Sequence, residues 1–332
     1  MFSVIILVFS VLLVFGILTG IFYLAKWIDC KHFMFAYHPA HLFIASLIIT
    51  LLFFLYGYSV GRWKMEVKQT EIAFATLPKS FDKYRIVQIS DIHAISFIDH
   101  EDKLQKLVDT INALQPDLIC IVGDLVNIHP NELETTAPIL SQLKATDGVV
   151  SVLGNHDLAN YMKKTDAEKR ALVDTLIEKQ KQMGWKMLNN ESIVIQRDSG
   201  EKITVVGVVN KNYKFTEQNN FRTCDLPKAL ENTDGFRILL THNPQHWHDE
   251  VRNLIPIDLS LSGHTHNAQV AFFGCSPSAW MYTEHSGLYE NTMPKTDFKQ
   301  YIYVTNGVGC TIPMRIGVPQ EVTVLDLRCK TP

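Results

Sequence analysis

The chain has 332 residues, of which 47% are hydrophobic and 20% charged, and its formal net charge is −3. This balance argues against nucleic acid as the main partner, because a nucleic-acid-binding face is normally strongly basic. The length is sufficient for one large domain and a smaller appendage.

The amino-terminal part of the chain is strongly apolar. Residues 1–25 and 33–61 contain no Asp, Glu, Lys or Arg, and a membrane-spanning helix needs about 20 such residues. We therefore predict two transmembrane helices, at about 2–25 and 41–60, within a membrane anchor formed by residues 1–63. A signal peptide is disfavoured because the first stretch lacks a basic start and a clear cleavage site. A buried hairpin of a soluble protein is the remaining alternative.

Basic residues beside these stretches indicate the side of the membrane on which the rest of the chain lies. Lys26 and Lys31 fall between the two stretches, whereas Arg62, Lys64 and Lys68 follow the second. Because positive residues are enriched on the cytoplasmic side, we expect a multi-pass protein of the cell membrane with its larger part in the cytoplasm. The six cysteines show no paired spacing, as in proteins of a reducing compartment.

From residue 64 onward, strand and helix patterns alternate. A loosely alternating run at 64–75 predicts a first strand, and Thr165 with Glu168 forms a capping-box pattern before a helix that reaches about Met183. Further strands are predicted at residues 192–196, 202–209, 236–241, 269–273, 301–305 and 321–327. This order predicts an α/β fold in which two sheets pack together with helices outside them.

Five short polar segments each follow an apolar run that is typical of a buried strand. They are Asp91-Ile-His93, Gly123-Asp124, Gly154-Asn-His-Asp157, His242 and Gly263-His-Thr-His266. Folds of the α/β class place binding and chemistry where strands end. Each segment alone is typical of a turn or a cap. A protein core has no need of so many titratable groups at strand ends, so the five together indicate a functional site.

The donor atoms in these segments suit metal ions. They come from the carboxylates of Asp91 and Asp124, the amide of Asn155, and the imidazoles of His93, His242, His264 and His266. This set is too large for one metal ion and fits two if one carboxylate bridges them. A metal pair about 3.5–4 Å apart suits displacement at phosphorus, because it neutralises the phosphoryl oxygens. Two divalent ions and two carboxylates leave a positive pocket, which predicts an anionic substrate. Nitrogen and oxygen ligands without cysteine favour manganese, iron or zinc.

The series of segments resembles the motifs of the calcineurin-like metallophosphoesterase superfamily, from about Arg85 to the end of the chain. The resemblance implies a four-layer α/β/β/α sandwich for residues 64–332 and two divalent metal ions, for which we expect manganese, with iron or zinc as alternatives. It assigns the first ion to Asp91, His93, Asp124 and His266. It assigns the second ion to the bridging Asp124 with Asn155, His242 and His264. It makes His156 the acid that protonates the leaving oxygen, and Asp157 the residue that orients it.

Three further features bear on the substrate. Arg315 is a candidate phosphate clamp, because a guanidinium pairs with phosphate oxygens; a surface salt bridge is the alternative. Residues 210–220 and 276–298 are predicted to be long loops without regular structure, which are often functional. The second loop is a candidate apolar wall or membrane contact, with ordinary packing as the alternative. Asn267 and Ala268 stand where many members of the superfamily have glycines.

The closing segment from Thr305 to Glu321 resembles the bacterial membrane-associated branch of the superfamily, which includes UDP-2,3-diacylglucosamine hydrolases of lipid A synthesis. We therefore expect a membrane-anchored hydrolase of phosphodiester or pyrophosphate bonds. Its expected substrate is a phosphate-containing small molecule or lipid, such as UDP-2,3-diacylglucosamine, and its other partner is the bilayer. A broad phosphomonoesterase or a protein phosphatase would share the same site. A non-catalytic metal-binding membrane module is disfavoured, because a structural site has no use for an unligated acid–base histidine.

Overall fold

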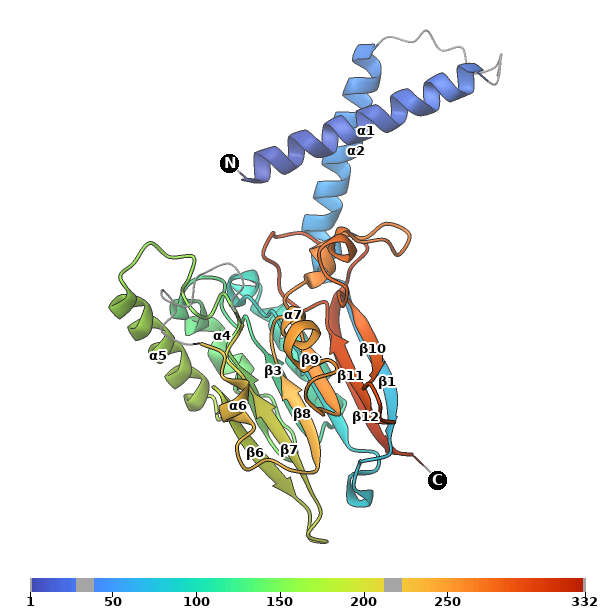
Figure 1. Cartoon of the computed structure of the whole chain (residues 1–332). Helices are drawn as coiled ribbons and strands as arrows, with labels where there is room; N and C mark the ends of the chain where they lie inside the picture. The colour runs from blue at the N-terminus through green and yellow to red at the C-terminus, as the bar shows by residue number, and fades with distance from the viewer. Residues whose placement is uncertain (1, 28–38, 212–222, 331–332) are drawn as a thin grey trace. The chain divides into compact units, whose positions relative to one another are not determined.

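The computed structural model describes residues 2–27, 39–211 and 223–330 (Figure 1). The chain divides into two compact units, residues 1–61 and residues 62–332. The first unit contains the helices α1 (Phe2–Trp27) and α2 (Pro39–Ser59). The second unit contains both sheets and all of the predicted site residues.

Within the part of the chain that the structure describes, one helix is long and apolar enough to cross a membrane, at Ala40–Trp63. Few of its side chains are buried, unlike those of the core helix of a soluble protein. The side chains of α1 are described at residues 11–24 only, and Val11–Leu24 is apolar. The expectation of two spans is therefore supported for one helix only, and a multi-pass topology is not supported.

Two six-stranded sheets form the second unit. The strand order of the first sheet is β1 (Met65–Phe74), β12 (Gln320–Cys329), β2 (Arg85–Ile89), β3 (Leu118–Val122), β4 (Val149–Val152) and β5 (Lys186–Met187). The order of the second sheet is β10 (Gly287–Thr292), β11 (Lys299–Val304), β9 (Leu259–Ser262), β8 (Phe236–Leu240), β7 (Lys202–Gly207) and β6 (Glu191–Gln196). The predicted α/β fold with two sheets is confirmed.

Helices contribute to the cores on the outer faces of the two sheets. The first sheet is covered by α3 (Glu101–Ala113), α4 (Leu133–Leu140) and α5 (Asp166–Gln182). The second sheet is covered by α6 (Leu226–Ala229) and by α7 (Pro244–His246), which continues into a π-helical turn at Trp247–Val251. The amino terminus of α5 has the predicted capping box, in which Thr165 and Glu168 bond each other's backbone.

The apolar strand β3 shows why the sheets are covered on both faces. All of its residues are buried. Ile119 and Ile121 belong to the hydrophobic cluster that contains α3 and α5, whereas Leu118, Cys120 and Val122 belong to the cluster between the sheets. Successive side chains of a strand point to opposite faces. A wholly apolar strand is therefore stable only between two layers, and this requirement produces the layered architecture.

Strand directions bring several strand ends to one edge of the first sheet. β2, β3 and β4 run parallel to one another. β12 is antiparallel to β2, with Thr323 opposite Gln88, and β1 is parallel to β12, with Met65 opposite Gln320. The beginning of β1 therefore lies at the same edge as the carboxyl ends of β2, β3 and β4.

Two segments differ from the sequence prediction. Residues 269–273 are not a strand, because Gln269 and Phe273 have φ angles of 57° and 52°, which extended backbone does not adopt. The predicted loop at 276–298 contains the edge strand β10, whose polar, glycine-containing sequence hides its pairing with β11. Most of the predicted loop at 210–220 lies outside the described residues.

A charged network joins the two sheets away from the predicted site. Asp147, which precedes β4, accepts two hydrogen bonds of 3.0 Å from the Arg197 guanidinium, which follows β6 in the other sheet. The hydroxyl of buried Tyr84, which precedes β2, donates to the same carboxylate at 2.7 Å. Bidentate pairing of this kind is among the stronger polar contacts in proteins. The network therefore fixes the sheets against each other at this edge.

Replacing Asp147 with alanine should lower the free energy of unfolding by about 1–3 kcal/mol, because the buried Tyr84 hydroxyl and the half-buried Arg197 guanidinium lose their acceptor. Chemical denaturation of the full chain in detergent measures this change. The matched control is Asp198→Ala, at an exposed position beside Arg197, which should change stability by less than about 0.5 kcal/mol. A change in the free energy of unfolding in Asp147→Ala as small as in the control would show that the network does not contribute to stability.

Candidate metal centre

Five loops bring the predicted ligands together. They follow β2, β3 and β4 in the first sheet and β8 and β9 in the second. Positive backbone φ is found at Asp91 (53°), His93 (40°), Asp124 (53°), His264 (70°) and His266 (49°). Non-glycine residues rarely adopt this conformation, and strained backbone is concentrated at functional sites. The loops therefore turn sharply at the residues whose side chains must converge.

Glycines beside the ligands permit this close approach. A Cβ atom on Gly154 would collide with the carboxylate of Asp124, and one on Gly263 would collide with that of Asp91. No other residue fits at either position without displacing a predicted ligand. The glycines of the sequence motifs are therefore needed for packing around the carboxylates.

The first group of donors consists of Asp91, His93 and His266, whose donor atoms lie within 4.8 Å of one another. His266 Nε2 is 3.1 Å from Asp91 Oδ1 and 3.2 Å from His93 Nε2. The two imidazole rings are stacked, with centroids 5.1 Å apart. Asp91 Oδ1 is buried without a hydrogen-bond donor among the described atoms. A buried, unbonded carboxylate oxygen beside two imidazole nitrogens fits a cation, which would satisfy all three atoms.

The second group consists of Asp124, His242 and His264, again within 4.8 Å. His242 Nε2 lies 3.1 Å from Asp124 Oδ2 and 3.1 Å from Asn155 Oδ1. The other ring nitrogen of His242 donates to the Val122 carbonyl at 2.8 Å. This bond fixes the tautomer and leaves Nε2 with a lone pair for a metal ion when the ring is neutral.

Asp124 is shared by the two groups. Its Oδ2 atom lies 3.1 Å from His242 Nε2 and 3.9 Å from His93 Nε2, and its Oδ1 atom accepts from the His156 backbone N–H at 2.8 Å. Asp124 is thus the carboxylate that lies near donors of both groups. All seven predicted ligands are brought together in this centre.

Burial and neighbouring charges set the protonation of the donors. Burial lowers the pKa of His93 to about 3 and that of His264 to about 3, which leaves both rings neutral. Burial acts to raise the pKa of Asp124, but His242 outweighs it and holds that pKa below its ordinary value. Burial acts to lower the pKa of His242, but Asp124 and Asp91 raise it to about 10. The protein without metal therefore carries a proton on His242 that a bound cation replaces.

Two tyrosines that the sequence did not single out as site residues orient the ligands. The Tyr161 hydroxyl accepts from Asn155 Nδ2 at 2.9 Å, which leaves the amide oxygen directed at His242. The Tyr282 hydroxyl shares a hydrogen bond of 3.0 Å with His264 Nε2. Tyr161 had no sequence signal beyond its closeness to the Gly154 motif, and Tyr282 lies in the predicted insertion. Both therefore support the metal ligands from outside.

The position of His156 agrees with the predicted role, but that of Asp157 does not. His156 Nδ1 donates to the Asn127 carbonyl at 2.6 Å, and this bond orients the ring. Asp157 instead accepts from the backbone N–H groups of Val126 and Gly154, at 3.1 and 2.8 Å. Burial, with the nearby Asp124 charge, raises the pKa of Asp157 to about 7. Asp157 therefore holds the loops in place, and the prediction that it orients His156 is corrected.

Arg315 is also corrected. The side chain is completely buried, and its guanidinium donates to backbone carbonyls that include those of Asn306, Gly307 and Gly309. A guanidinium enclosed by carbonyls is not available to a phosphate. The residue holds the loop between β11 and β12, which packs against the loop that carries Asp91. Neither the predicted phosphate clamp nor the surface salt bridge describes it.

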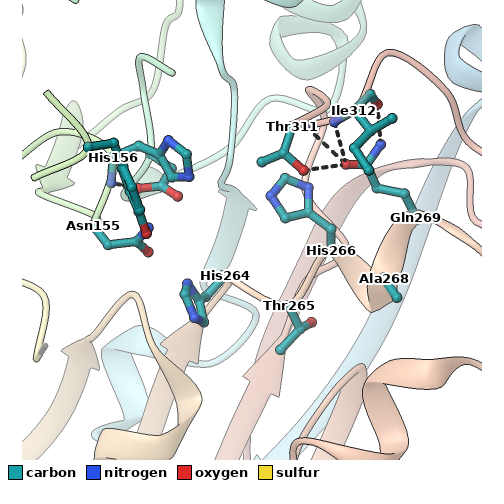
Figure 2. A pocket seen from close by; sticks show the side chains of 11 residues that line it. Asn155, His156, His264, Thr265, His266, Ala268, Gln269, Thr311 and Ile312 are labelled. Carbon is teal, nitrogen blue, oxygen red and sulfur yellow. Dashed lines mark hydrogen bonds between the residues drawn. The ribbon is translucent and has the colours of Figure 1, made fainter. Parts of the chain in front are cut away.

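A cavity of ≈ 210 Å³ opens beside both groups of donors. Figure 2 shows Asn155 and His156 on one side and Gln269 with Thr311 on the other. Gln269 Oε1 accepts from the Thr311 backbone N–H at 3.0 Å and from its hydroxyl at 2.8 Å, while Nε2 donates to the Ile312 carbonyl at 2.7 Å. Gln269 therefore joins the loops that follow β9 and β11 at the cavity wall.

The turn before Gln269 explains the sequence departure at Asn267 and Ala268. Their φ angles are 48° and 54°, and that of Gln269 is 57°. This is the left-handed region, which glycine adopts freely and alanine does not. The backbone therefore keeps a path that favours glycine although neither residue is glycine.

Comparison with known proteins identifies the class. Residues 84–268 match the calcineurin-like phosphoesterase family. A "transmembrane protein with metallophosphoesterase domain" of Danio rerio is 31% identical over 294 residues, which cover 86% of this chain and 62% of the relative. The "uncharacterized metallophosphoesterase YkuE" of Bacillus subtilis is 29% identical over 292 residues, which cover 82% of this chain and 90% of the relative. This chain thus spans less than two thirds of the length of the Danio rerio relative.

The chain belongs to the calcineurin-like phosphoesterases, a family of metal-dependent phosphoric ester hydrolases. A Campylobacter jejuni relative, 29% identical over 87% of this chain and 70% of its own length, is also named a metallophosphoesterase. The candidate metal ligands are consistent with that membership, and the family assignment agrees with the resemblance inferred from the motifs.

Replacing Asp124 with asparagine should lower the affinity for metal by at least ~100-fold, because the shared carboxylate loses its charge toward both groups. Metal content after gel filtration, measured by mass spectrometry, tests this expectation. The matched control is Asp109→Asn, on the exposed face of α3, which should retain the metal content of the wild type. Two tightly bound ions in Asp124→Asn would contradict the assignment of the bridge.

Replacing Ala268 with glycine should raise the free energy of unfolding by up to ~1 kcal/mol. Glycine removes the strain of the left-handed conformation in the folded state, and this gain exceeds the entropy that glycine adds to the unfolded chain. Urea denaturation of the full chain measures the difference. The control is Ala171→Gly in the exposed part of α5, which should destabilise by about 1 kcal/mol. A loss of stability in Ala268→Gly as large as in the control would show that residue 268 carries no strain.

Proposed function

We propose that the protein is a membrane-anchored phosphoesterase that hydrolyses phosphodiester or pyrophosphate bonds with two divalent metal ions. The observation that carries the proposal is Asp124, whose carboxylate lies between His242 and His93 at 3.1 and 3.9 Å. A carboxylate shared by two groups of donors is what a metal pair requires. When bound, such a pair neutralises phosphoryl oxygens and activates water for attack on phosphorus.

The two groups of donors suggest how the ions are divided. One ion would be held by Asp91, His93, Asp124 and His266. The other would be held by Asp124, Asn155, His242 and His264. Manganese is the ion we propose, with iron or zinc as alternatives, because these nitrogen and oxygen donors suit all three.

His156 is the proposed general acid. It lines the cavity beside the metal centre, and its Nδ1 atom is committed to the Asn127 carbonyl. Nε2 is then the nitrogen that would give a proton to the leaving oxygen, a role to which imidazole is suited near neutral pH. One ring nitrogen of His156 lies within 4.8 Å of donor atoms of His93 and Asp124, so the ring would act next to the reacting phosphate.

A second cavity supports a substrate larger than a phosphate. It has a volume of ≈ 350 Å³ and shares Asn155, Tyr161 and His264 with the first cavity. Its lining combines the apolar Met281 with polar residues that include Asn210, whose buried Oδ1 atom has no partner among the described atoms. Such a cavity suits the sugar or nucleotide part of a lipid-linked nucleotide. UDP-2,3-diacylglucosamine is the specific substrate that we propose.

The proposed location is the cell membrane, with α2 as the anchor and the second unit in the cytoplasm. Support comes from the apolar stretch Ala40–Trp63 and from the relatives of Danio rerio and Bos taurus, which are named transmembrane proteins. Arg62, Lys64 and Lys68 follow this stretch, as basic residues do on the cytoplasmic side. The bilayer is therefore the proposed partner, and nucleic acid is not.

A broad phosphomonoesterase or protein phosphatase is the second candidate, because it would use the same ligands. The test is hydrolysis by the full chain, loaded with manganese in detergent, of UDP-2,3-diacylglucosamine, an aryl phosphodiester and an aryl phosphomonoester. Faster turnover of the lipid nucleotide or the diester supports the proposal, and faster turnover of the monoester favours the second candidate. No turnover with two ions bound would favour a non-catalytic metal-binding module.

Replacing His156 with alanine should leave the metal content unchanged but lower kcat by roughly 10²–10⁴, the usual contribution of a general acid. The loss should be smaller for a nitrophenolate leaving group, which needs no proton, than for an alkyl alcohol. Steady-state kinetics on the two esters measure the difference. The control is His129→Asn, which keeps an acceptor for the Asn131 backbone N–H and should retain activity. An equal loss on both esters would argue against proton donation by His156.

A further inference from the structure

A loop beside the candidate metal centre carries solvent-exposed aromatic side chains. Residues 270–283, here termed the aromatic loop, contain no charged residue. Phe273 is fully exposed, and Trp280 and Met281 are 88% and 70% exposed. Exposed apolar side chains are normally scattered singly over a soluble surface, whereas a group of them marks an interaction site. The aromatic loop therefore has the composition of a docking surface.

The tip of the loop holds an aromatic residue in strained backbone. Phe272 and Cys275 exchange two backbone hydrogen bonds, of 3.0 and 2.9 Å, so Phe273 and Gly274 form a two-residue turn. Both have positive φ, 52° and 79°, as in a type I′ turn, where Asn or Gly is the usual first residue. The side chain of Phe273 is fully exposed, so its own packing does not offset this strain. Strain without compensation points to a function for the aromatic side chain.

The base of the aromatic loop is fixed to the metal centre. Ser276 Oγ donates to the Asn267 carbonyl at 2.7 Å, and Ser278 Oγ donates to Asn267 Oδ1 at 2.9 Å. Tyr282, at the other end, bonds His264 at 3.0 Å. The exposed side chains of the aromatic loop therefore occupy a defined position beside the candidate metal centre.

The chain that leads to α2 leaves the second unit at the edge where the aromatic loop begins. The first residue of β1 pairs with Gln320, whose N–H donates to the Lys64 carbonyl at 2.7 Å. Ile316, shortly before Gln320, pairs with Val270 at the start of the aromatic loop. Residues 60–64 alone separate α2 from β1, and an extended chain covers about 3.5 Å per residue. A bilayer that contains α2 is therefore close to this edge.

We infer that the aromatic loop inserts into the interfacial region of the bilayer that holds α2. The inference rests on the membrane anchoring proposed above. Aromatic rings are favoured at the level of the headgroups, and Trp and Phe are the residues by which amphipathic segments bind there. The absence of charge from residues 270–283 removes the main cost of insertion. Insertion would set the metal centre over lipid headgroups, as a lipid-linked substrate requires.

The test is fluorescence quenching in vesicles. The full chain is reconstituted in phosphatidylcholine vesicles that contain lipids brominated either near the headgroup or at the chain ends. The chain has five tryptophans, so subtracting the signal of Trp280→Phe isolates Trp280. We expect quenching by the shallow bromines and weaker quenching by the deep ones. A Trp280 signal that neither lipid quenches, in vesicles that carry the protein, overturns the inference.

A second variant tests the tip of the loop. Phe273→Asp should reduce the quenching of Trp280 at least about twofold, because a charge at the tip opposes insertion. The matched control is Leu254→Asp, which is also exposed but precedes β9, at the other end of that strand from the ligands. Both variants should hydrolyse a soluble aryl phosphodiester at the rate of the wild type. Unchanged quenching in Phe273→Asp would overturn the inference.

The measurements separate this inference from the proposed function. Protein that floats with the vesicles and hydrolyses the diester, but whose Trp280 is not quenched, retains the proposed function and loses the insertion. Protein that does not float with the vesicles contradicts the anchoring, and the insertion fails with it.

Discussion

The structure depends on one arrangement of charge, the Asp124 carboxylate between the imidazoles of two groups of donors. A buried carboxylate is costly unless opposite charge or hydrogen bonds surround it. Imidazoles at strand ends of both sheets surround the Asp124 carboxylate, and the His156 backbone N–H donates a hydrogen bond to it. The two sheets must therefore face each other with their ligand-bearing ends together. The apolar cluster between the sheets holds them in this face-to-face packing.

This convergence imposes conditions on the backbone. The ligand loops reverse direction within one or two residues, so several of them use left-handed conformations that disfavour most side chains. Gly154 and Gly263 have no side chain because each lies against a carboxylate. The free energy lost to this strain is offset by the buried core on both faces of the sheets. The motif glycines are thus a consequence of the close packing at the metal centre.

The same edge of the fold brings three features together. The cavities, the aromatic loop and the beginning of β1 all lie where strands of the first sheet meet the loops of the second. In the proposed function the anchor joins the second unit at this edge, which would suit a substrate that remains in the bilayer. This relation follows from β12, which runs antiparallel to β2 and carries β1 beside it.

The sequence by itself determined the alternation of strands and helices and the two-sheet α/β class, because apolar periodicity is a local property. The order of its motifs also singled out the residues that the fold brings together in the candidate metal centre. The tertiary structure alone decided the strand order, the roles of Asp157 and Arg315, and the support from Tyr161 and Tyr282. Asp157 adjoins His156 in the sequence, yet its carboxylate bonds backbone groups of two loops. Arg315 resembled a surface residue because its carbonyl partners form only when the loop closes around it. Local sequence patterns predict secondary structure and candidate site residues. Contacts between distant segments and the φ angles of tight turns arise only when the chain is folded.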